Sequence, residues 1–240
     1  MNLRRTARAA GALYLITFAA SLPGLVLLDP VLNDPAYIVG PGTDAQVVLG
    51  AVLELVNAAA LVGTAIVLFP VVKRQSEALA LGFVAARTVE AALVVVNVVS
   101  YLTVVTLRQP TATGPDADML VTVGRSLITV HDWAFLLGQS TIPGINALLL
   151  GTLMYQSRLV PRLLPSIGLA GAPVFLAAVI AVMFGVFDQF STWAIIAGAP
   201  IFVWELALGL WLVAKGFRPS PITSGPTDAD TLADAHHVKP

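Results

Sequence analysis

The chain has 240 residues, of which 57% are hydrophobic and only 11% are charged, and its formal net charge is −1. This composition, with a mean hydropathy of +0.86, excludes an ordinary soluble domain and predicts an integral membrane protein. The chain contains no cysteine, which excludes disulfides, thiolate metal sites and cysteine nucleophiles. Since each span takes about 20 residues, we expect an all-α, polytopic transmembrane helical bundle of six spans in one domain, residues 1–218.

The N-terminal stretch 1–8 is basic, and the apolar run 9–28 follows it. A basic start before an apolar run is also typical of a signal peptide, and Ala19-Ala20-Ser21 offers small residues for cleavage. The run nevertheless has the full length of a bilayer span, which a signal peptide lacks. We therefore expect residues 9–28 to be retained as the first transmembrane helix.

Polar side chains recur along the next two predicted spans. The second span, 47–72, carries Glu54 and Asn57, and the third span, 78–105, carries Arg87, Glu90, Asn97 and Tyr101. Residues three, four or seven positions apart lie on one face of a helix, so each set forms a polar stripe in an apolar segment. Because ionisable groups at membrane depth are costly without partners, both stripes should face other helices or a wet cavity.

The longest predicted connection is the loop 107–131. Its apolar residues recur at helical spacing, so part of it is expected to lie as a helix on the membrane surface before the fourth span. The fourth span is predicted at 132–154, with an interruption at Pro143-Gly144, because a proline inside a helix removes a backbone hydrogen bond. Such an interruption exposes backbone groups that transporters use for ligands, and a simple kink is the alternative.

The last two spans are predicted at 166–187 and 191–214. The first contains Gly168 and Gly171, a small-residue spacing suited to close helix packing. The second contains a possible interruption at Gly198-Ala199-Pro200, and also Glu205. After residue 218 the composition shifts to proline, threonine and aspartate, which predicts a disordered cytoplasmic tail over 219–240.

Lysine and arginine are unequally distributed between the two sides of the predicted bundle. Nine lie on one side: Arg4, Arg5, Arg8, Lys73, Arg74, Arg158, Arg162, Lys215 and Arg218. Only Arg108 and Arg125 lie on the other side. The excess predicts that both termini are cytoplasmic. We expect the lipid bilayer as a partner and no nucleic acid, because the basic residues flank the spans instead of forming a separate patch.

The ionisable residues of the spans fall at neighbouring depths, given a helical rise of about 1.5 Å per residue. We therefore expect one buried polar core of six residues: Arg87, Glu90, Glu54, Glu205, Asn57 and Asn97. One arginine cannot neutralise three glutamates, so at least one carboxyl group should hold a proton near neutral pH. Two interpretations stay open: a site for a proton, a cation or a polar ligand, and a structural clamp in which Arg87 bridges Glu90 and a second glutamate.

Motifs for catalysis are weak. Gly138-Gln139-Ser140 is similar to the Gly-x-Ser of intramembrane serine proteases, but no histidine lies inside a predicted span to act as the base. His131 and Asp132, expected at the outer mouth of the fourth span, are candidates for a metal or acid–base element or for simple interfacial capping. His236-His237 fall in the predicted tail, across the membrane from them. We therefore identify no catalytic residue and no metal site, and expect no cofactor.

Three segments carry recognisable motifs. They are Arg8-Ala-Ala-Gly11-Ala-Leu-Tyr14-Leu15, Phe83-x-x-x-Arg87-x-x-Glu90-Ala91 and Gly151-Thr-Leu-Met-Tyr155-Gln-Ser157-Arg-Leu-Val-Pro161-Arg162. Together they resemble the bacterial membrane family known as domain of unknown function 4386. The resemblance implies about six helices and makes Arg87 and Glu90 a family feature. Relatives commonly have glycine where Arg158 stands and often a histidine near Asn146, so no role of that histidine carries over here.

The sequence favours a non-enzymatic sensor, accessory protein or small-ligand- or lipid-binding protein of the bacterial plasma membrane. A small proton-coupled secondary transporter is the alternative, and an intramembrane enzyme is the third hypothesis. Transport requires water access to the glutamates from both sides, a sensor requires a dry and permanently paired core, and an enzyme requires a pocket that converges on a nucleophile or base. The sequence predicts neither the ligand nor the oligomeric state.

Overall fold

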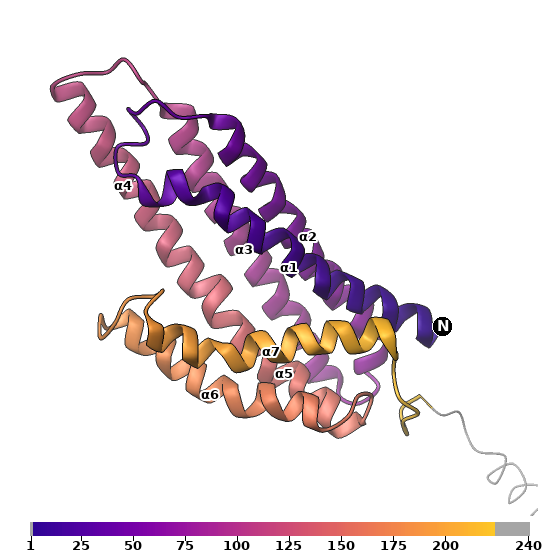
Figure 1. Ribbon diagram of the computed structural model, residues 1–240. Helices are drawn as coiled ribbons and strands as arrows, with labels where there is room; N and C mark the ends of the chain where they lie inside the picture. The colour runs from indigo at the N-terminus through magenta and orange to yellow at the C-terminus, as the bar shows by residue number, and fades with distance from the viewer. Residues whose placement is uncertain (1, 224–240) are drawn as a thin grey trace, which may run out of the picture.

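The computed structural model describes residues 2–223, and within them the secondary structure is helical, with no strand. The elements in chain order (Figure 1) are α1 (Leu3–Asn33), α2 (Asp44–Val72), α3 (Glu77–Leu107), α4 (Pro115–Phe135), the π-helical turn η1 (Leu136–Ser140), α5 (Thr141–Ser157), α6 (Leu163–Met183) and α7 (Thr192–Ala214). Because α4, η1 and α5 form one unbroken stretch of 43 residues, six stretches are long and apolar enough to cross a membrane. The predicted all-α bundle of six spans is confirmed.

The predicted loop 107–131 is wrong over most of its length, because α4 begins at Pro115 and continues directly into the fourth span. Gly114, at φ 62°, turns the chain in a conformation that suits glycine. Pro115 follows in the first turn, where its missing N–H costs nothing, and Asp116 favours the helix N-terminus. The helical spacing of the apolar residues therefore marks the start of a long helix and not a separate surface segment.

The interruption predicted at Pro143-Gly144 is wrong, because α5 runs through both residues; the helix instead widens just before the proline, in η1. There the N–H of Thr141 donates to the carbonyl of Leu136, five residues back, and the Thr141 hydroxyl donates to the same carbonyl at 2.8 Å. In a regular helix the ring of Pro143 would meet the carbonyl of Gln139, so the wider π turn relieves this conflict. α7, by contrast, runs unbroken through Pro200.

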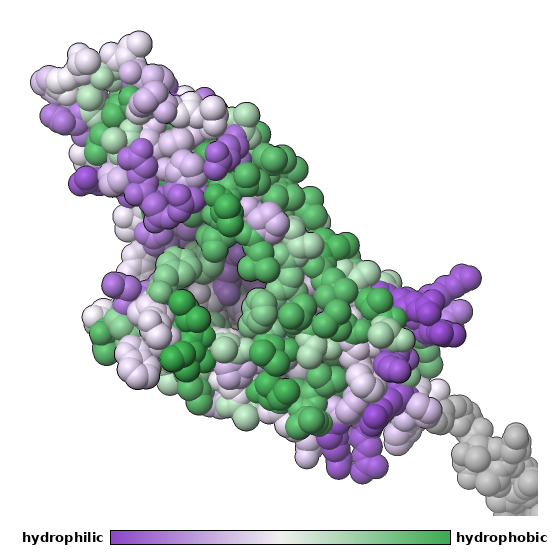
Figure 2. Space-filling model, viewed as in Figure 1, coloured by the Kyte–Doolittle hydropathy of each residue, from purple (hydrophilic) through white to green (hydrophobic). Residues whose placement is uncertain are grey.

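The helices differ in length, and the difference shapes the molecule. α6 and α7 have 21 and 23 residues, or about 32 to 35 Å, which matches a bilayer. α1 and α3 have 31 residues each, and the α4–α5 stretch is longer still. Figure 1 shows the excess length beyond the α6–α7 hairpin, at the end where α4 begins, and Figure 2 shows this end as hydrophilic. We call it the projecting end.

Close helix contacts depend on glycine at two places. A Cβ at Gly11 of α1 would lie 2.6 Å from the carbonyl oxygen of Gly209 in α7, so the two backbones touch. A Cβ at Gly171 of α6 would lie 2.5 Å from the Cβ of Pro200 in α7. Small residues let membrane helices approach this closely, as the Gly168 and Gly171 spacing predicts.

Arg108 holds the loops of the projecting end together. Its guanidinium donates to the carbonyls of Tyr37 at 3.0 Å and Gly42 at 2.8 Å, and also to that of Gly40. It forms an ion pair with Asp44 at 2.6 Å. Partial burial raises the pKa of the Tyr37 hydroxyl, which therefore stays protonated and donates to Asp44 at 3.2 Å.

Residues 216–223 fold back across the opposite end of the bundle, which corrects the predicted start of the tail at residue 219. The N–H of Arg218 donates to the carbonyl of Leu159 at 2.8 Å, and the buried Ser220 donates its hydroxyl to the carbonyl of Ser157. The rest of the predicted tail, 224–240 with His236-His237, lies outside the described residues. The start of α1 and the end of α7 lie at this same end (Figure 1).

Candidate functional site

Arg87 of α3 is the centre of a buried hydrogen-bonded cluster, with only 1% of its surface exposed. Its Nη1 donates to Glu90 Oε2 at 3.0 Å, and its Nη2 donates to the Tyr14 hydroxyl at 3.2 Å. Nη2 also donates to Glu205 Oε1. The amide of Asn146 donates to Glu90 Oε2 at 3.1 Å. We call these five residues the Arg87 cluster.

The Arg87 cluster connects four helices, since Tyr14 comes from α1, Arg87 and Glu90 from α3, Asn146 from α5 and Glu205 from α7. An unpaired charge at this depth would cost several kcal/mol. The two carboxyl groups offset that cost, as does the Tyr14 ring, which lies 5.2 Å from the guanidinium carbon. This geometry is that of a clamp between helices.

Glu54 of α2 belongs to a second buried group and is 6% exposed. Its Oε2 accepts hydrogen bonds from Asn57 Nδ2 at 3.2 Å and from Gln139 Nε2 at 3.4 Å. Gln139 lies in η1, and its Oε1 accepts a hydrogen bond from Asn97 Nδ2 of α3 at 3.0 Å. The π-helical turn therefore supplies the amide that connects α2 with α3.

The single polar core predicted from the sequence is thus two groups. No hydrogen bond or ion pair within residues 2–223 joins Glu54 to the Arg87 cluster. Asn97 lies seven residues after Glu90, about 10 Å further along α3, so the two parts of one polar stripe meet different neighbours. Glu205 of α7 reaches the level of Arg87, whereas Glu54 reaches the level of Asn97.

A cavity of about 220 Å³ opens beside Glu54. Its polar lining consists of Glu54, Asn97, Tyr101, His131 and Gln139. The facing wall is apolar and comes from α1: Leu22, Leu25, Leu28 and Leu32, next to Ser21. The cavity therefore combines hydrogen-bonding groups on one side with hydrocarbon on the other.

A second cavity of about 540 Å³ continues from the first, with which it shares Leu25, Leu32, His131 and Phe135. It extends to Asp29, Asp132 and Gln189. We call the two cavities together the α1–α4 groove. Figure 2 shows a recess with hydrophilic surface at its bottom, between α1 and the α6–α7 hairpin.

Buried polar atoms of three residues that line the groove have no hydrogen-bond partner among the described residues: Gln189 Nε2 at the wider cavity, and two atoms at the 220 Å³ cavity. The last two are the hydroxyl of Tyr101 and Oδ1 of Asn97, on side chains that are 0% and 2% exposed. Buried polar atoms without partners are rare and costly. Both residues line the 220 Å³ cavity, although the two atoms themselves are buried.

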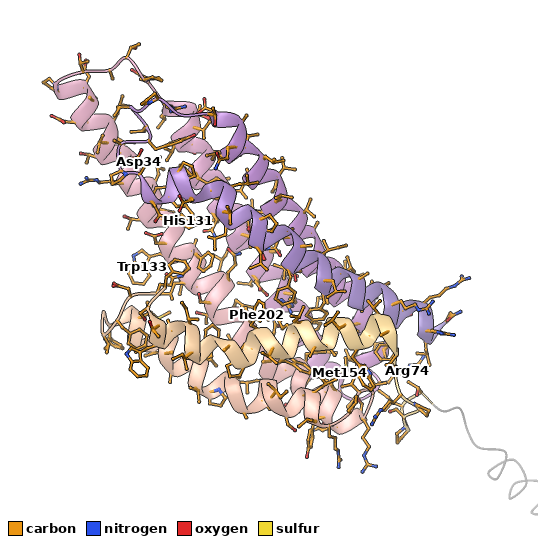
Figure 3. All side chains as sticks on the ribbon, viewed as in Figure 1. Asp34, Arg74, His131, Trp133, Met154 and Phe202 are labelled. Atoms are coloured by element: carbon orange, nitrogen blue, oxygen red, sulfur yellow. The ribbon has the colours of Figure 1, made fainter. Side chains whose placement is uncertain are left out.

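The sequence predicts His131 at the outer mouth of the fourth span, but the structure places it inside α4, where it is buried. Its ring centre lies 6.0 Å from that of Tyr101, and its Nδ1 lies 3.2 Å from Oδ1 of the exposed Asp132. Trp133, half exposed, points away from the bundle (Figure 3). Because α4 starts 17 residues before the predicted span, residue 131 lies inside the helix and faces the interior of the bundle.

Three side chains of the two groups are absent from the predicted core: Tyr14, Asn146 and Gln139. All three are uncharged and lie in α1, α5 and η1, outside the polar stripes of the second and third spans. An amide inside an apolar run and close to a proline is the signal that would have identified Gln139, since such a residue must find hydrogen-bond partners within the bundle.

Two of the sites considered from the sequence, a metal site and the Gly138-Gln139-Ser140 motif, fall within the described part of the chain. Within residues 2–223, no three His, Asp or Glu side chains lie close enough together to hold a metal ion. In the same region, Ser140 of the Gly138-Gln139-Ser140 motif makes no hydrogen bond to His131.

Comparison with known proteins gives one family. The family model described as Domain of unknown function (DUF4386) matches residues 9–216, which include the Arg87 cluster and the α1–α4 groove. No curated protein and no solved structure matches the chain. Since the match extends over most of the sequence, this protein belongs to the DUF4386 family, as its three motifs predict.

Proposed function

We propose that the protein is a non-enzymatic integral membrane protein that binds a small amphiphilic ligand in the α1–α4 groove. The observation that supports this most directly is the pair of unpartnered atoms, Tyr101 OH and Asn97 Oδ1, on the lining of the groove. Two unpartnered polar atoms on residues that line one cavity support a polar occupant there.

The lining suggests the chemistry of the ligand. Asn97 Oδ1 and the carboxyl group of Glu54 are hydrogen-bond acceptors, so they suit a head group that carries N–H donors. The leucines of α1 suit a hydrocarbon chain. Asp29 and Asp132 at the wider end of the groove attract cations. We therefore propose an alkyl amine, or a lipid with an amine head group, as the ligand class.

The runner-up is a small proton-coupled transporter. A titratable carboxyl group, Glu54, and a histidine, His131, line the same cavity, which supports it. Transport also requires an alternate conformation that opens the groove at the opposite end. The paired Arg87 cluster, which ties α1, α3, α5 and α7 together, favours a static binding protein instead.

We propose further that both termini are cytoplasmic and that the protein resides in the bacterial plasma membrane as one transmembrane domain. The unequal distribution of Lys and Arg between the two ends supports this orientation, since nine of these residues lie at the end where α1 begins and α7 finishes.

The proposed ligand class can be tested with decylamine, decanol and decanoate, which share one chain length. The purified protein should gain thermal stability from decylamine and less from the other two. Glu54→Gln should abolish this preference but retain the fold, because glutamine can still accept the hydrogen bond from Asn57. Glu77→Gln, at an exposed position of α3, is the matched control and should behave like the parent.

Equal stabilisation by all three compounds, or an unchanged preference in Glu54→Gln, would contradict the proposal. Proteoliposomes separate binding from transport. If an imposed pH gradient drives accumulation of decylamine in a Glu54-dependent way, the transporter hypothesis replaces that of a static binding protein.

A further inference from the structure

The end of the bundle opposite the projecting end carries a basic pocket of about 410 Å³. Its lining consists of Arg158, Val160, Arg162, Arg218 and Pro219. None of these residues belongs to the Arg87 cluster or to the α1–α4 groove. We call this cavity the Arg158 pocket.

The three arginines of the pocket have no carboxylate partner among residues 2–223. The guanidinium carbon of Arg162 lies 4.9 Å from the centre of the Tyr155 ring, and that of Arg218 lies 5.3 Å from the Trp211 ring. Stacking occupies one face of a guanidinium and leaves its N–H edge available to an anion. Three cations around one concavity repel each other, and a bound anion relieves that repulsion.

Backbone contacts hold this part of the chain in place. The Arg218 N–H donates to the Leu159 carbonyl at 2.8 Å, and Arg74 of the α2–α3 turn donates to the Ile222 carbonyl at 3.3 Å. Figure 3 shows Arg74 at this end of the bundle. The segment that carries Arg218 is thus fastened to two turns, so the pocket is formed before any ligand arrives.

Arg158 is the one residue other than glycine, within the described chain, whose φ is positive, at 57°. It caps the C-terminus of α5, a position where glycine would adopt the same conformation without strain. Strained backbone of this kind is concentrated at functional sites. Arg158 is exposed and adopts this conformation although it lowers the stability of the fold. In return, its side chain adds a positive charge to the pocket.

We propose that the Arg158 pocket binds a phosphate group. Arginine N–H groups match phosphate oxygens in paired hydrogen bonds. The pocket lies where α5 and α7 finish and α6 begins, and the aromatic rings of Tyr155 and Trp211 are typical of the membrane–water interface. This is the depth of phospholipid head groups, so an anionic phospholipid is the expected source, and a soluble phosphate compound is the other.

The full chain, purified in a neutral detergent, should be tested by thermal unfolding with phosphatidylglycerol, phosphatidylcholine or inorganic phosphate at constant ionic strength. Phosphatidylglycerol should raise the midpoint of the parent more than phosphatidylcholine does. Arg158→Gly and Arg218→Gln should each abolish that rise. The double variant Arg4→Gln/Arg5→Gln removes two exposed cations from the same end, outside the pocket, and should keep it.

Arg158→Gly also separates binding from folding. Because glycine relieves the positive φ, its midpoint without lipid should equal or exceed that of the parent, whereas a purely structural arginine would lower it. An equal rise from inorganic phosphate, with the same arginine dependence, would assign the site to a soluble phosphate compound. If both pocket variants keep the parent's response, or the control variant loses it equally, the pocket is not a phosphate site.

Discussion

Tyr14 and Tyr101 are both buried in the bundle, but their hydroxyl groups have opposite surroundings. The Tyr14 hydroxyl accepts a hydrogen bond from Arg87 and so contributes to stabilising a buried cation. The Tyr101 hydroxyl has no partner among the described residues and lies on the α1–α4 groove. At the scale of single residues, the Tyr14 hydroxyl is paired and the Tyr101 hydroxyl is not, and the Arg87 cluster itself keeps two buried atoms without a partner among the described residues, Arg87 Nε and Asn146 Oδ1.

The substitution of each tyrosine by phenylalanine tests this distinction. Tyr14→Phe should lower the free energy of unfolding by about 1.5 to 3 kcal/mol, because it removes the partner of a charged donor. Tyr101→Phe should leave it unchanged or raise it by up to about 1 kcal/mol, because it removes an unsatisfied hydroxyl. Thermal unfolding in detergent measures both, and each variant serves as the control of the other. An equal loss of unfolding free energy in the two variants would show that the Tyr101 hydroxyl also has a hydrogen-bond partner.

At the scale of elements, η1 decides where the polar groups of the fourth span point. The π-helical turn contains Gln139, four residues before Pro143. The side-chain amide of Gln139 donates a hydrogen bond to Glu54 and accepts one from Asn97. A π turn adds one residue to a regular helix and rotates the two flanking segments relative to each other. The same feature that accommodates a proline therefore directs an amide into the groove.

The contact of α1 with α7 provides a test of element packing. Gly11→Val should strongly destabilise the protein, because its side chain would collide with backbone atoms of Gly209 and Val213. Gly82→Ala on α3 is the matched control: its Cβ would lie 3.4 Å from a Leu149 side-chain carbon, and alanine favours the helix, so stability should be equal or higher. Thermal unfolding and the yield of monodisperse protein measure the effect. A tolerated Gly11→Val would mean that α1 and α7 are further apart.

At the scale of the whole molecule, the unequal helix lengths indicate an asymmetric protein. At one end the helices finish close together, and at the other the long helices extend beyond the α6–α7 hairpin as a projection that Arg108 fastens to Tyr37 and Asp44. The α1–α4 groove reaches Asp29, Asp132 and Gln189, at the level where the shorter α6–α7 hairpin ends. The projection therefore stands beside the wider mouth of the groove.

The natural absence of cysteine makes topology measurable with single cysteines. In spheroplasts, a membrane-impermeant maleimide should label Thr113→Cys and Ser126→Cys, both exposed at the projecting end. Arg4→Cys should react only after lysis. Val203→Cys, exposed in the middle of α7 and expected to face lipid, is the control and should react in neither case. Labelling of Arg4→Cys in intact spheroplasts would reverse the proposed orientation, and an unreactive Ser126→Cys would place the start of α4 in the bilayer.

Composition and hydropathy alone were sufficient to predict the six spans, and the motifs to predict the family, because both depend on features that are local in the chain. The pairing of Arg87 with Glu90 is also local, since residues three apart share one helix face. Its pairing with Glu205 could be predicted from depth, because antiparallel spans of similar length align their midpoints.

Only the tertiary structure decided how the polar residues divide and which of them face a cavity. The separation of Glu54 from Arg87 could not be predicted, because the depth of a residue along its helix does not determine which neighbouring helix its side chain faces. Gln139 lines the groove because of the π turn, and His131 because α4 begins long before the predicted span. The π turn and the early start of α4 both depend on how neighbouring helices pack. The sequence determines the depth of each polar group along its own helix, whereas the rotation and neighbours of that helix are set by packing across the bundle.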